Sequence, residues 1–302
     1  MKSFFTNLFQ KYIIKKDIRN FKRNFIYYFL FRFIRNFLNS KLIINIYNFK
    51  LYASNKKNAT SYSILRKCDF EDKSELNFIK KISDDNSTYL IDCGSNFGFY
   101  SLFVASLSEK NKITSVEAST KIFKDQSENI KLNNFQSIEM FNYAVSNNND
   151  LFVELNESEN DWESSISHNK FNSIGKTKVK TITVDKLMEN KELSNFHLLI
   201  KIDVEGHEMN VIKGSYNTIK IYSPLIIIEF SKFIEMNDKN DYENLNFFLD
   251  QYDYQVYDAE YKKVNLKIVK ERLNKLPKNM YGIGNNFLIK KNSNFEKMIQ
   301  NV

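Results

Sequence analysis

The stretch from Tyr89 to Gly98 limits the fold of this chain more than any other. It begins with a short apolar run that ends in Asp92, and Gly94 and Gly98 then follow four positions apart. An apolar, helix-compatible pattern resumes at Phe99. The pattern predicts a strand, a tight glycine turn and a helix start, at the carboxyl edge of an open parallel sheet where a ligand can reach the backbone.

The form of this turn indicates the kind of ligand. A dinucleotide loop reads GxGxxG, whereas this turn reads Asp-x-Gly-x-x-x-Gly, and no phosphate loop with Lys followed by Ser or Thr is found. The next predicted strand, residues 112–116, ends at Glu117, whose carboxylate can accept hydrogen bonds from both hydroxyls of a ribose. The loop therefore favours an adenosine-type ligand, and S-adenosylmethionine over NAD.

Further short motifs follow along the chain and carry a family resemblance. The segments are Asp92-Cys93-Gly94-Ser95-Asn96-Phe97-Gly98, Val116-Glu117, Ala144-Val145-Ser146, Thr183-Val184-Asp185 and Lys201-Ile202-Asp203-Val204-Glu205-Gly206-His207-Glu208. In these motifs the chain resembles the FkbM family of S-adenosylmethionine-dependent methyltransferases, over about residues 70–230. It departs from the family pattern at Ser95 and Ala118, where alanine and proline are usual, and neither change removes a ligand-contacting group.

The resemblance implies a class I methyltransferase fold. We expect a Rossmann-like, mostly parallel seven-stranded sheet with helices on both faces, formed by residues 42–302, and a basic helical extension over residues 1–41. The cofactor is expected to be S-adenosyl-L-methionine. The residues expected to bind it are Asp92, Gly94, Ser95, Asn96, Gly98, Glu117 and Ala144.

A second stretch carries the candidate chemistry. Residues 197–202 read as a buried strand, and Asp203 falls at its carboxyl end, beside the glycine turn if this strand lies across the switch point. Asp203, Glu205 and His207 are the candidate catalytic residues, because a hydroxyl acceptor must lose a proton. A solvated helix N-terminus, or His207 as a hydrogen-bonding spacer, is the structural alternative. We predict no metal, although Asp203, Glu205 and Glu229 leave a divalent ion open as an alternative.

The N-terminal extension carries the basic charge of the chain. Residues 1–41 contain ten Lys or Arg and one Asp, which gives +9, so that the other residues sum to −1 in a chain of net charge +8. Ile14, Ile18, Phe21 and Phe25 recur at helical spacing and predict a basic amphipathic helix. Two partners stay open for residues 1–38: an anionic membrane surface, or packing on its own domain or on a twin subunit in a homodimer.

The leading function is O-methylation of a sugar, polysaccharide or small-metabolite hydroxyl. A nucleic-acid methyltransferase is the second alternative, although no Asn/Asp-Pro-Pro-aromatic element occurs and basic residues do not line the motifs, so no nucleic-acid partner is expected. A non-catalytic binding protein on the same fold is the third. Two cysteines, Cys68 and Cys93, fit no disulfide framework, and we expect a cytoplasmic enzyme, with peripheral contact at the inner membrane face left open.

Overall fold

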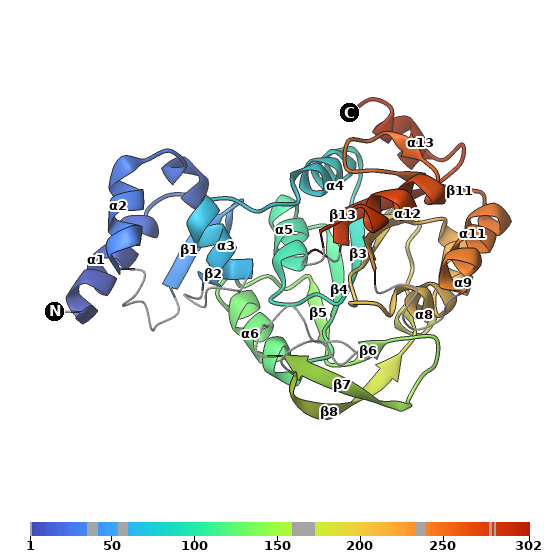
Figure 1. The fold of residues 1–302 in the computed structure, drawn as a ribbon, viewed down its shortest axis with the longest axis horizontal. Coiled ribbons are helices and arrows are strands. Elements are labelled where there is room, and N and C mark those ends of the chain that lie inside the picture. The colour runs from blue at the N-terminus through green and yellow to red at the C-terminus, as the bar shows by residue number, and fades with distance from the viewer. Residues whose placement is uncertain are drawn as a thin grey trace.

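An eight-stranded sheet forms the centre of the protein in a computed structural model that describes residues 2–34, 42–53, 60–158, 173–232, 240–277, 280 and 282–302 (Figure 1). In order across the sheet, the strands are β12 (Lys263–Val264), β11 (Tyr254–Tyr257), β13 (Gly282–Lys290), β10 (Leu225–Ser231), β9 (His197–Ile202), β3 (Thr88–Cys93), β4 (Lys112–Val116) and β5 (Ile138–Phe141). The five strands from β10 to β5 are parallel, and β13, β11 and β12 add antiparallel pairings. This confirms the predicted Rossmann-like fold, with the two-residue β12 as the additional strand.

The switch point of the sheet lies between β3 and β9. From β3 the chain proceeds to β4 and β5 on one side, and from β9 it proceeds to β10 on the other. Strand β9 therefore lies beside β3, as the sequence predicted, and the carboxyl ends of both strands meet. In open sheets of this kind ligands bind in the crevice at this position.

Alternating side chains bury both faces of the sheet. Leu90 and Leu199 belong to one apolar core, whereas their neighbours Ile91 and Ile200 belong to the other. The first core is covered by α4 (Lys73–Asp85), α5 (Phe99–Leu107) and α13 (Asn294–Ile299). The second is covered by α8 (Glu208–Lys213), α9 (Tyr216–Tyr222), α11 (Asp241–Tyr252) and α12 (Leu266–Asn274). Apolar strands buried on both faces are typical of parallel sheets.

A separate three-stranded sheet follows β5. It consists of β6 (Ala144–Val145), β7 (Phe152–Ser158) and β8 (Ser173–Ile182), with β8 in the centre. Strands β7 and β8 pair in an antiparallel arrangement along their length. Helix α7 (Val184–Leu187) connects this sheet to β9, while α6 (Thr120–Lys131) lies between β4 and β5 in the chain.

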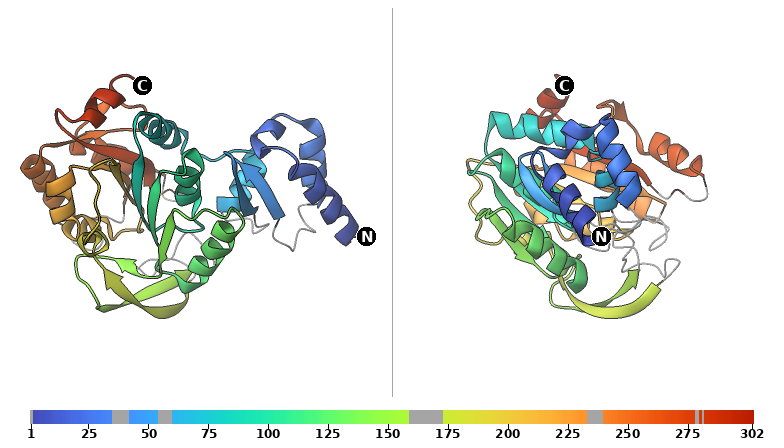
Figure 2. Two further views of the ribbon diagram at one scale, coloured as in Figure 1. Left: turned by 180° about the vertical axis from the view of Figure 1, so that it is seen from behind. Right: turned by 90° about the vertical axis from the view of Figure 1, so that its left-hand side faces the viewer.

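The N-terminal residues form a lobe at one end of the molecule, most clearly in Figure 2. The lobe consists of α1 (Lys2–Ile13), the 3₁₀ helix η1 (Ile18–Phe21), α2 (Phe25–Ile34), the hairpin β1 (Leu42–Ile46) and β2 (Phe49–Ala53), and α3 (Thr60–Lys67). It is joined to the body by hydrogen bonds from Lys50 N and Tyr52 N to the side chains of Asn133 and Asn129 on and after α6. Within the described residues, no helix has both the length and the apolar character needed to cross a bilayer.

The prediction of one amphipathic helix through Ile14 and Phe25 is wrong, because the helical structure is interrupted between α1 and α2. Asp17 caps η1 by accepting a hydrogen bond from Arg19 N at 2.9 Å, and it also accepts one from Tyr47 N on the β1–β2 turn. A carboxylate that satisfies backbone N–H groups on two segments stabilises a turn at the expense of a continuous helix. Ile18 and Phe21 are buried as the pattern predicted, whereas Phe25 is exposed.

Candidate active site

The two glycines of the turn are required by its geometry. Gly94 has a φ of +77°, and a Cβ placed on it would lie 1.9 Å from the carbonyl oxygen of Asp203. Gly98 has a φ of +88° at the start of α5, where a Cβ would lie 2.9 Å from Gln126 Cγ. Only glycine avoids both problems at these positions. The glycine turn therefore brings the ends of β3 and β9 into direct backbone contact.

Glu117 is held in place by the turn. Asn96 N donates to its Oε2 at 2.9 Å, and Ser119 N donates to its Oε1 at 2.8 Å. Burial raises the pKa of Glu117 to about 7, although these two hydrogen bonds act in the opposite direction. Each carboxylate oxygen has a further lone pair, so the group can still accept a hydroxyl hydrogen bond.

The other predicted cofactor residues lie beneath the surface. Asp92 is fully buried, accepts a hydrogen bond from Ser101 Oγ at 2.7 Å, and has no partner for Oδ1 among the described residues. Ser95 is buried and accepts from Gln126 Nε2 at 2.7 Å. Ala144 is buried in β6. Asp92 and Ser95 thus stabilise the turn from its buried side, through their hydrogen bonds with Ser101 and Gln126.

Asp203 lies at the point where the two strands meet. Its backbone N donates to Cys93 O at 3.1 Å, and its Oδ2 accepts from Lys201 Nζ at 2.8 Å. Lys201 is 3% exposed, and its ammonium lies 4.7 Å from the ring centroid of Tyr100. Burial lowers the pKa of Lys201, but the charges of Asp203 and Asp92 outweigh this effect and raise it. Lys201 is therefore a buried cation that orients the Asp203 carboxylate.

Three carboxylates converge where the loop after β9 meets the end of β10. One oxygen from each of Asp203, Glu205 and Glu229 lies within 4.8 Å of the others, and we call these residues the acidic cluster. Burial raises the pKa of Glu229 well above its usual value, and the charges of Asp203 and Glu205 raise it further. Gly282 on β13 permits this arrangement, because a Cβ there would lie 2.6 Å from Glu229 Oε1. Like charges this close favour a bound proton or a cation.

His207 faces a different partner from the acidic cluster. It precedes α8, and its Nε2 lies 2.9 Å from Ser146 Oγ while Nδ1 lies 3.2 Å from Asn210 Nδ2. Burial and, to a smaller extent, the charge of Lys213 lower its pKa to about 4. The neighbouring Glu208 is buried, accepts from Gly206 N, and has its pKa raised to about 7 by burial. Of the three predicted catalytic residues, the fold brings Asp203 and Glu205 together and directs His207 toward β6.

A polar network next to Lys201 had no assigned role in the sequence analysis. Tyr100 OH donates to Asp72 Oδ2 at 2.8 Å, and Asn285 Nδ2 donates to the same oxygen at 3.2 Å. Burial raises the pKa of Asp72. The only sequence signal for this network was the lysine in an otherwise apolar strand, because its members come from three distant segments.

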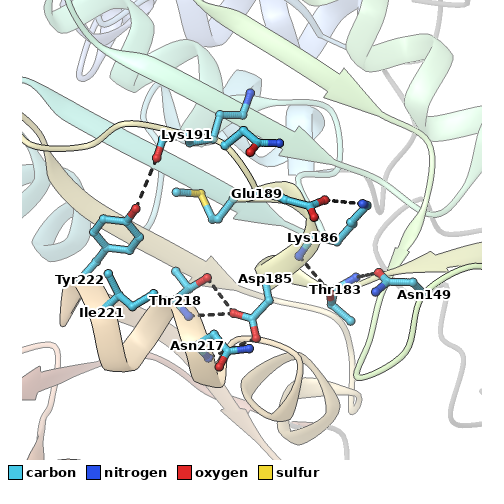
Figure 3. Close-up of a pocket in the computed structure, with 12 residues that line it drawn as sticks. Asn149, Thr183, Asp185, Lys186, Glu189, Lys191, Asn217, Thr218, Ile221 and Tyr222 are labelled. Carbon is cyan, nitrogen blue, oxygen red and sulfur yellow. Dashed lines mark hydrogen bonds and ion pairs between the residues drawn. The ribbon is translucent and has the colours of Figure 1, made fainter.

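An open pocket of about 450 Å³ lies against α7 and α9, and none of the predicted cofactor or catalytic residues lines it (Figure 3). Its lining includes Thr183 and Asp185 of the fourth motif, and both side chains cap helices. Thr183 caps α7 by accepting from Lys186 N, and Asp185 caps α9 by accepting from Asn217 N and Thr218 N. Thr183 is thus the cap of α7, whereas Asp185, which lies inside α7, caps a helix that begins about thirty residues later.

The fold and the geometry define the class of the protein. A doubly wound sheet, a glycine turn held against a buried carboxylate, and acidic side chains across the switch point are typical of Rossmann-like methyltransferases. The model of the methyltransferase FkbM domain matches residues 92–256, more than half of the chain. The chain belongs to the FkbM methyltransferase family, and the predicted class, a methyltransferase dependent on S-adenosyl-L-methionine, is confirmed.

Individual relatives are more distant. Hexuronic acid methyltransferase AglP of Haloferax volcanii is 33% identical over 69 residues, which cover 23% of this chain and only 28% of that protein. The methyltransferase FkbM from Methylobacillus flagellatus has a TM-score of 0.39 and 17% identity, over 65% of this chain and 49% of that one. An O-methyltransferase from Bacillus cereus, solved with SAH, has a TM-score of 0.43 and 13% identity, over 74% and 83%. Structural scores of this size carry no functional argument.

Proposed function

We propose that the protein is an O-methyltransferase that uses S-adenosyl-L-methionine to methylate a hydroxyl of a sugar, a polysaccharide or a small metabolite. One observation carries the proposal: Gly94 packs against the backbone of Asp203, so that Glu117 and the acidic cluster stand at the same edge of the sheet. A donor bound at Glu117 would lie next to an acceptor bound at the acidic cluster.

The residues on the β3 side fit an adenosine-containing donor. The left-handed Gly94 and Gly98 leave the backbone open to a ligand, and Glu117 is already oriented by Asn96 N and Ser119 N. We assign the ribose hydroxyls to Glu117, and the support of the loop to Asp92 and Ser95. When bound, S-adenosyl-L-methionine supplies an electrophilic methyl group on a sulfonium.

The residues on the β9 side fit the removal of a proton. Lys201 holds Asp203 in one orientation, from which its carboxylate can accept a hydrogen bond from the acceptor hydroxyl. Asp203, held by Lys201, takes the hydroxyl proton as the oxygen–carbon bond forms and the carbon–sulfur bond breaks, and Glu229, whose raised pKa favours its protonated form, shares its own proton with Asp203. The negative charge of Glu205 is assigned the role of stabilising the proton that the neighbouring carboxylates hold.

His207 receives a positioning role in this proposal. Its hydrogen bond to Ser146 joins α8 to the end of β6, and its lowered pKa makes it a weak base. A divalent cation on the acidic cluster stays an alternative to the shared proton, since carboxylate oxygens are suitable ligands for Mg²⁺.

The acceptor class is supported by charge and by the AglP relative. The acidic cluster repels a polyanion such as RNA, and the net positive charge of the chain lies in residues 1–41, which carry +9 while the other residues sum to −1. The relative's name identifies it as a methyltransferase of a sugar acid, and we carry over only the sugar class, because the shared segment is short. Cys68 and Cys93 are buried free thiols, which supports a location in the reducing cytoplasm.

The acceptor is tested with S-adenosyl-L-methionine carrying a tritiated methyl group. The full chain is incubated in parallel with glycan fractions, nucleotide sugars and total RNA. We expect label in a sugar-containing fraction, in base-stable ether linkage. Label in RNA alone would establish the nucleic-acid alternative, and calorimetric binding of the donor without transfer to any fraction would support a non-catalytic protein.

A further inference from the structure

Helix α2 has an apolar face that nothing in the described chain covers. Phe25, Ile26 and Phe29 are 82%, 58% and 61% exposed, whereas Tyr27 and Phe31 on the opposite side of the helix are buried in the lobe. With 3.6 residues per turn, the three exposed side chains form one continuous stripe. Soluble surfaces carry scattered apolar residues, but a contiguous group of this kind indicates a binding surface.

Exposed cations lie at both ends of this stripe and along the segment that precedes it in the chain. Seven Lys or Arg side chains between residues 7 and 32 are exposed, and Asp17 is the single acidic residue of that segment. Arg19 pairs with Asp17 and Lys22 with Asp69. The remaining five have no ion pair with any residue that the structure describes: Lys11, Lys15, Lys16, Arg23 and Arg32. Arg23 and Arg32 flank the stripe at the two ends of α2.

We propose that the apolar stripe of α2 and its basic surroundings dock the enzyme on an anionic lipid surface. Phe25, Ile26 and Phe29 enter the headgroup region, and the cations contact lipid phosphates, with the helix in the plane of the interface. The basic charge near the stripe favours an anionic lipid surface over a second copy of the chain as its partner. A symmetric dimer through this face would bring two basic patches together, whereas an anionic surface neutralises them.

The shape of the molecule fits this orientation. Figures 1 and 2 show α1 and α2 at the far end of the lobe, beyond the β1–β2 hairpin, with the sheet of the methyltransferase body at the other end. Contact through α2 therefore leaves the body exposed to acceptors. Residues 42–302 are nearly neutral, so the attraction to lipid is confined to one end.

The test is flotation of the full chain with vesicles. We expect binding to vesicles of phosphatidylglycerol and phosphatidylcholine in equal amounts, little binding to phosphatidylcholine alone, and loss of binding in about 1 M salt, where the Debye length falls to about 3 Å. The double variant Phe25→Ser/Phe29→Ser should bind about tenfold more weakly or worse. Arg23→Gln/Arg32→Gln should bind about tenfold more weakly in low salt.

The matched control is Phe152→Ser/Phe247→Ser, which removes two phenylalanines that are 63% and 65% exposed on β7 and α11. This control should bind vesicles like the unmodified chain, and all variants should keep their methyl transfer activity. Equal flotation of every variant, or no flotation with anionic vesicles, would overturn the proposal. A lipid-free dimer that Phe25→Ser/Phe29→Ser dissociates would assign the stripe to a second copy instead.

Discussion

The carboxylates on the two sides of the switch point differ in how their negative charge is balanced. On the β3 side, both oxygens of Glu117 accept backbone hydrogen bonds, so the carboxylate is satisfied before any ligand arrives. On the β9 side, Asp203, Glu205 and Glu229 bring three carboxylates within 4.8 Å, with the buried cation of Lys201 beside Asp203. The first side is preorganised, and the second carries excess negative charge.

We propose that this difference separates donor binding from proton transfer. A preorganised carboxylate fixes a ligand without rearranging, which suits the tight binding of a donor. A cluster of carboxylates in which the pKa of Glu229 is raised can hold a proton, which suits acid–base work. Changes on the β3 side should therefore alter donor affinity, and changes on the β9 side should alter turnover.

The largest effect is expected from Asp203→Asn. Asparagine keeps the size of the side chain and can still accept from Lys201, but it loses the charge that attracts the hydroxyl proton. We expect kcat to fall about 10²–10⁴-fold with donor affinity changed less than about threefold, measured by methyl transfer and by calorimetry.

Asp84→Asn is the control for Asp203→Asn, because Asp84 is an exposed carboxylate on α4 with only a distant lysine partner at 3.9 Å. Its kinetics should equal those of the unmodified enzyme. If Asp203→Asn weakened donor binding as strongly as it slowed turnover, the separation of the two sides would be wrong.

The contact between the two sides is tested by Gly94→Ala. The added Cβ would lie 1.9 Å from Asp203 O, and the φ of +77° is unfavourable for alanine, so β3 and β9 must move apart at their ends. We expect a loss of about 2–4 kcal/mol in the free energy of unfolding, with weakened donor binding and slowed turnover together. Denaturant unfolding measures the first quantity.

Gly175→Ala gives the comparison for this variant. Gly175 lies on β8, and within the part of the chain that the structure describes no atom lies within 4 Å of a Cβ placed there. Its stability should change by less than about 0.5 kcal/mol. Equal stability of the two variants would show that the backbone contact at Gly94 is not constrained.

Glu117→Gln should act on the β3 side alone. Glutamine can accept only one of the two backbone hydrogen bonds and carries no charge, so donor affinity should fall about 10–100-fold. Exposed Glu139, which pairs with Lys191, gives the control Glu139→Gln. The ionised form of Glu117 is the better acceptor, so the donor should bind more weakly to the unmodified enzyme as the pH falls below about 7.

The same pKa has a consequence for folding. The pKa of Glu117 rises from 4.5 to about 7, mainly through burial, so the folded state binds more protons than the unfolded state between these values. The contribution of Glu117 to the free energy of unfolding is fully present below pH 4.5 and is lost as the pH rises through about 7. Without donor, Glu117→Gln should lose this slope, which thermal unfolding at several pH values measures.

Local patterns made one part of this site predictable. The apolar run before Asp92 and the two glycines identified β3, the turn and α5, because strand and turn preferences depend on neighbouring residues. The run that ends at Asp203 identified β9 in the same way. Its position beside β3 followed from the topology rule for switch points.

Contacts between distant segments could not be predicted in this way. Asp72, Tyr100 and Asn285 meet only after the antiparallel β13 is added beside β10, and the sequence does not specify that register. The break at Asp17 was missed for the same reason, since the carboxylate is held by Tyr47 N on a later hairpin. The helical spacing of the apolar residues around it was real, but tertiary hydrogen bonds overrode it.

The smallest effect is expected from His207→Asn. This variant tests whether His207 takes part in proton transfer together with the acidic cluster. Burial lowers the pKa of His207 from 6.5 to about 4, so its contribution to stability is present above pH 6.5 and is lost as the pH falls through 4. The variant should lose about 1 kcal/mol at pH 7 and lack that slope, because a neutral amide replaces the imidazole next to Ser146. Its kcat should change less than about threefold, and its pH–rate profile should keep its shape. A loss of about 100-fold with a shifted profile would instead make His207 the base, because a residue that only joins α8 to β6 has no proton to exchange with the acceptor.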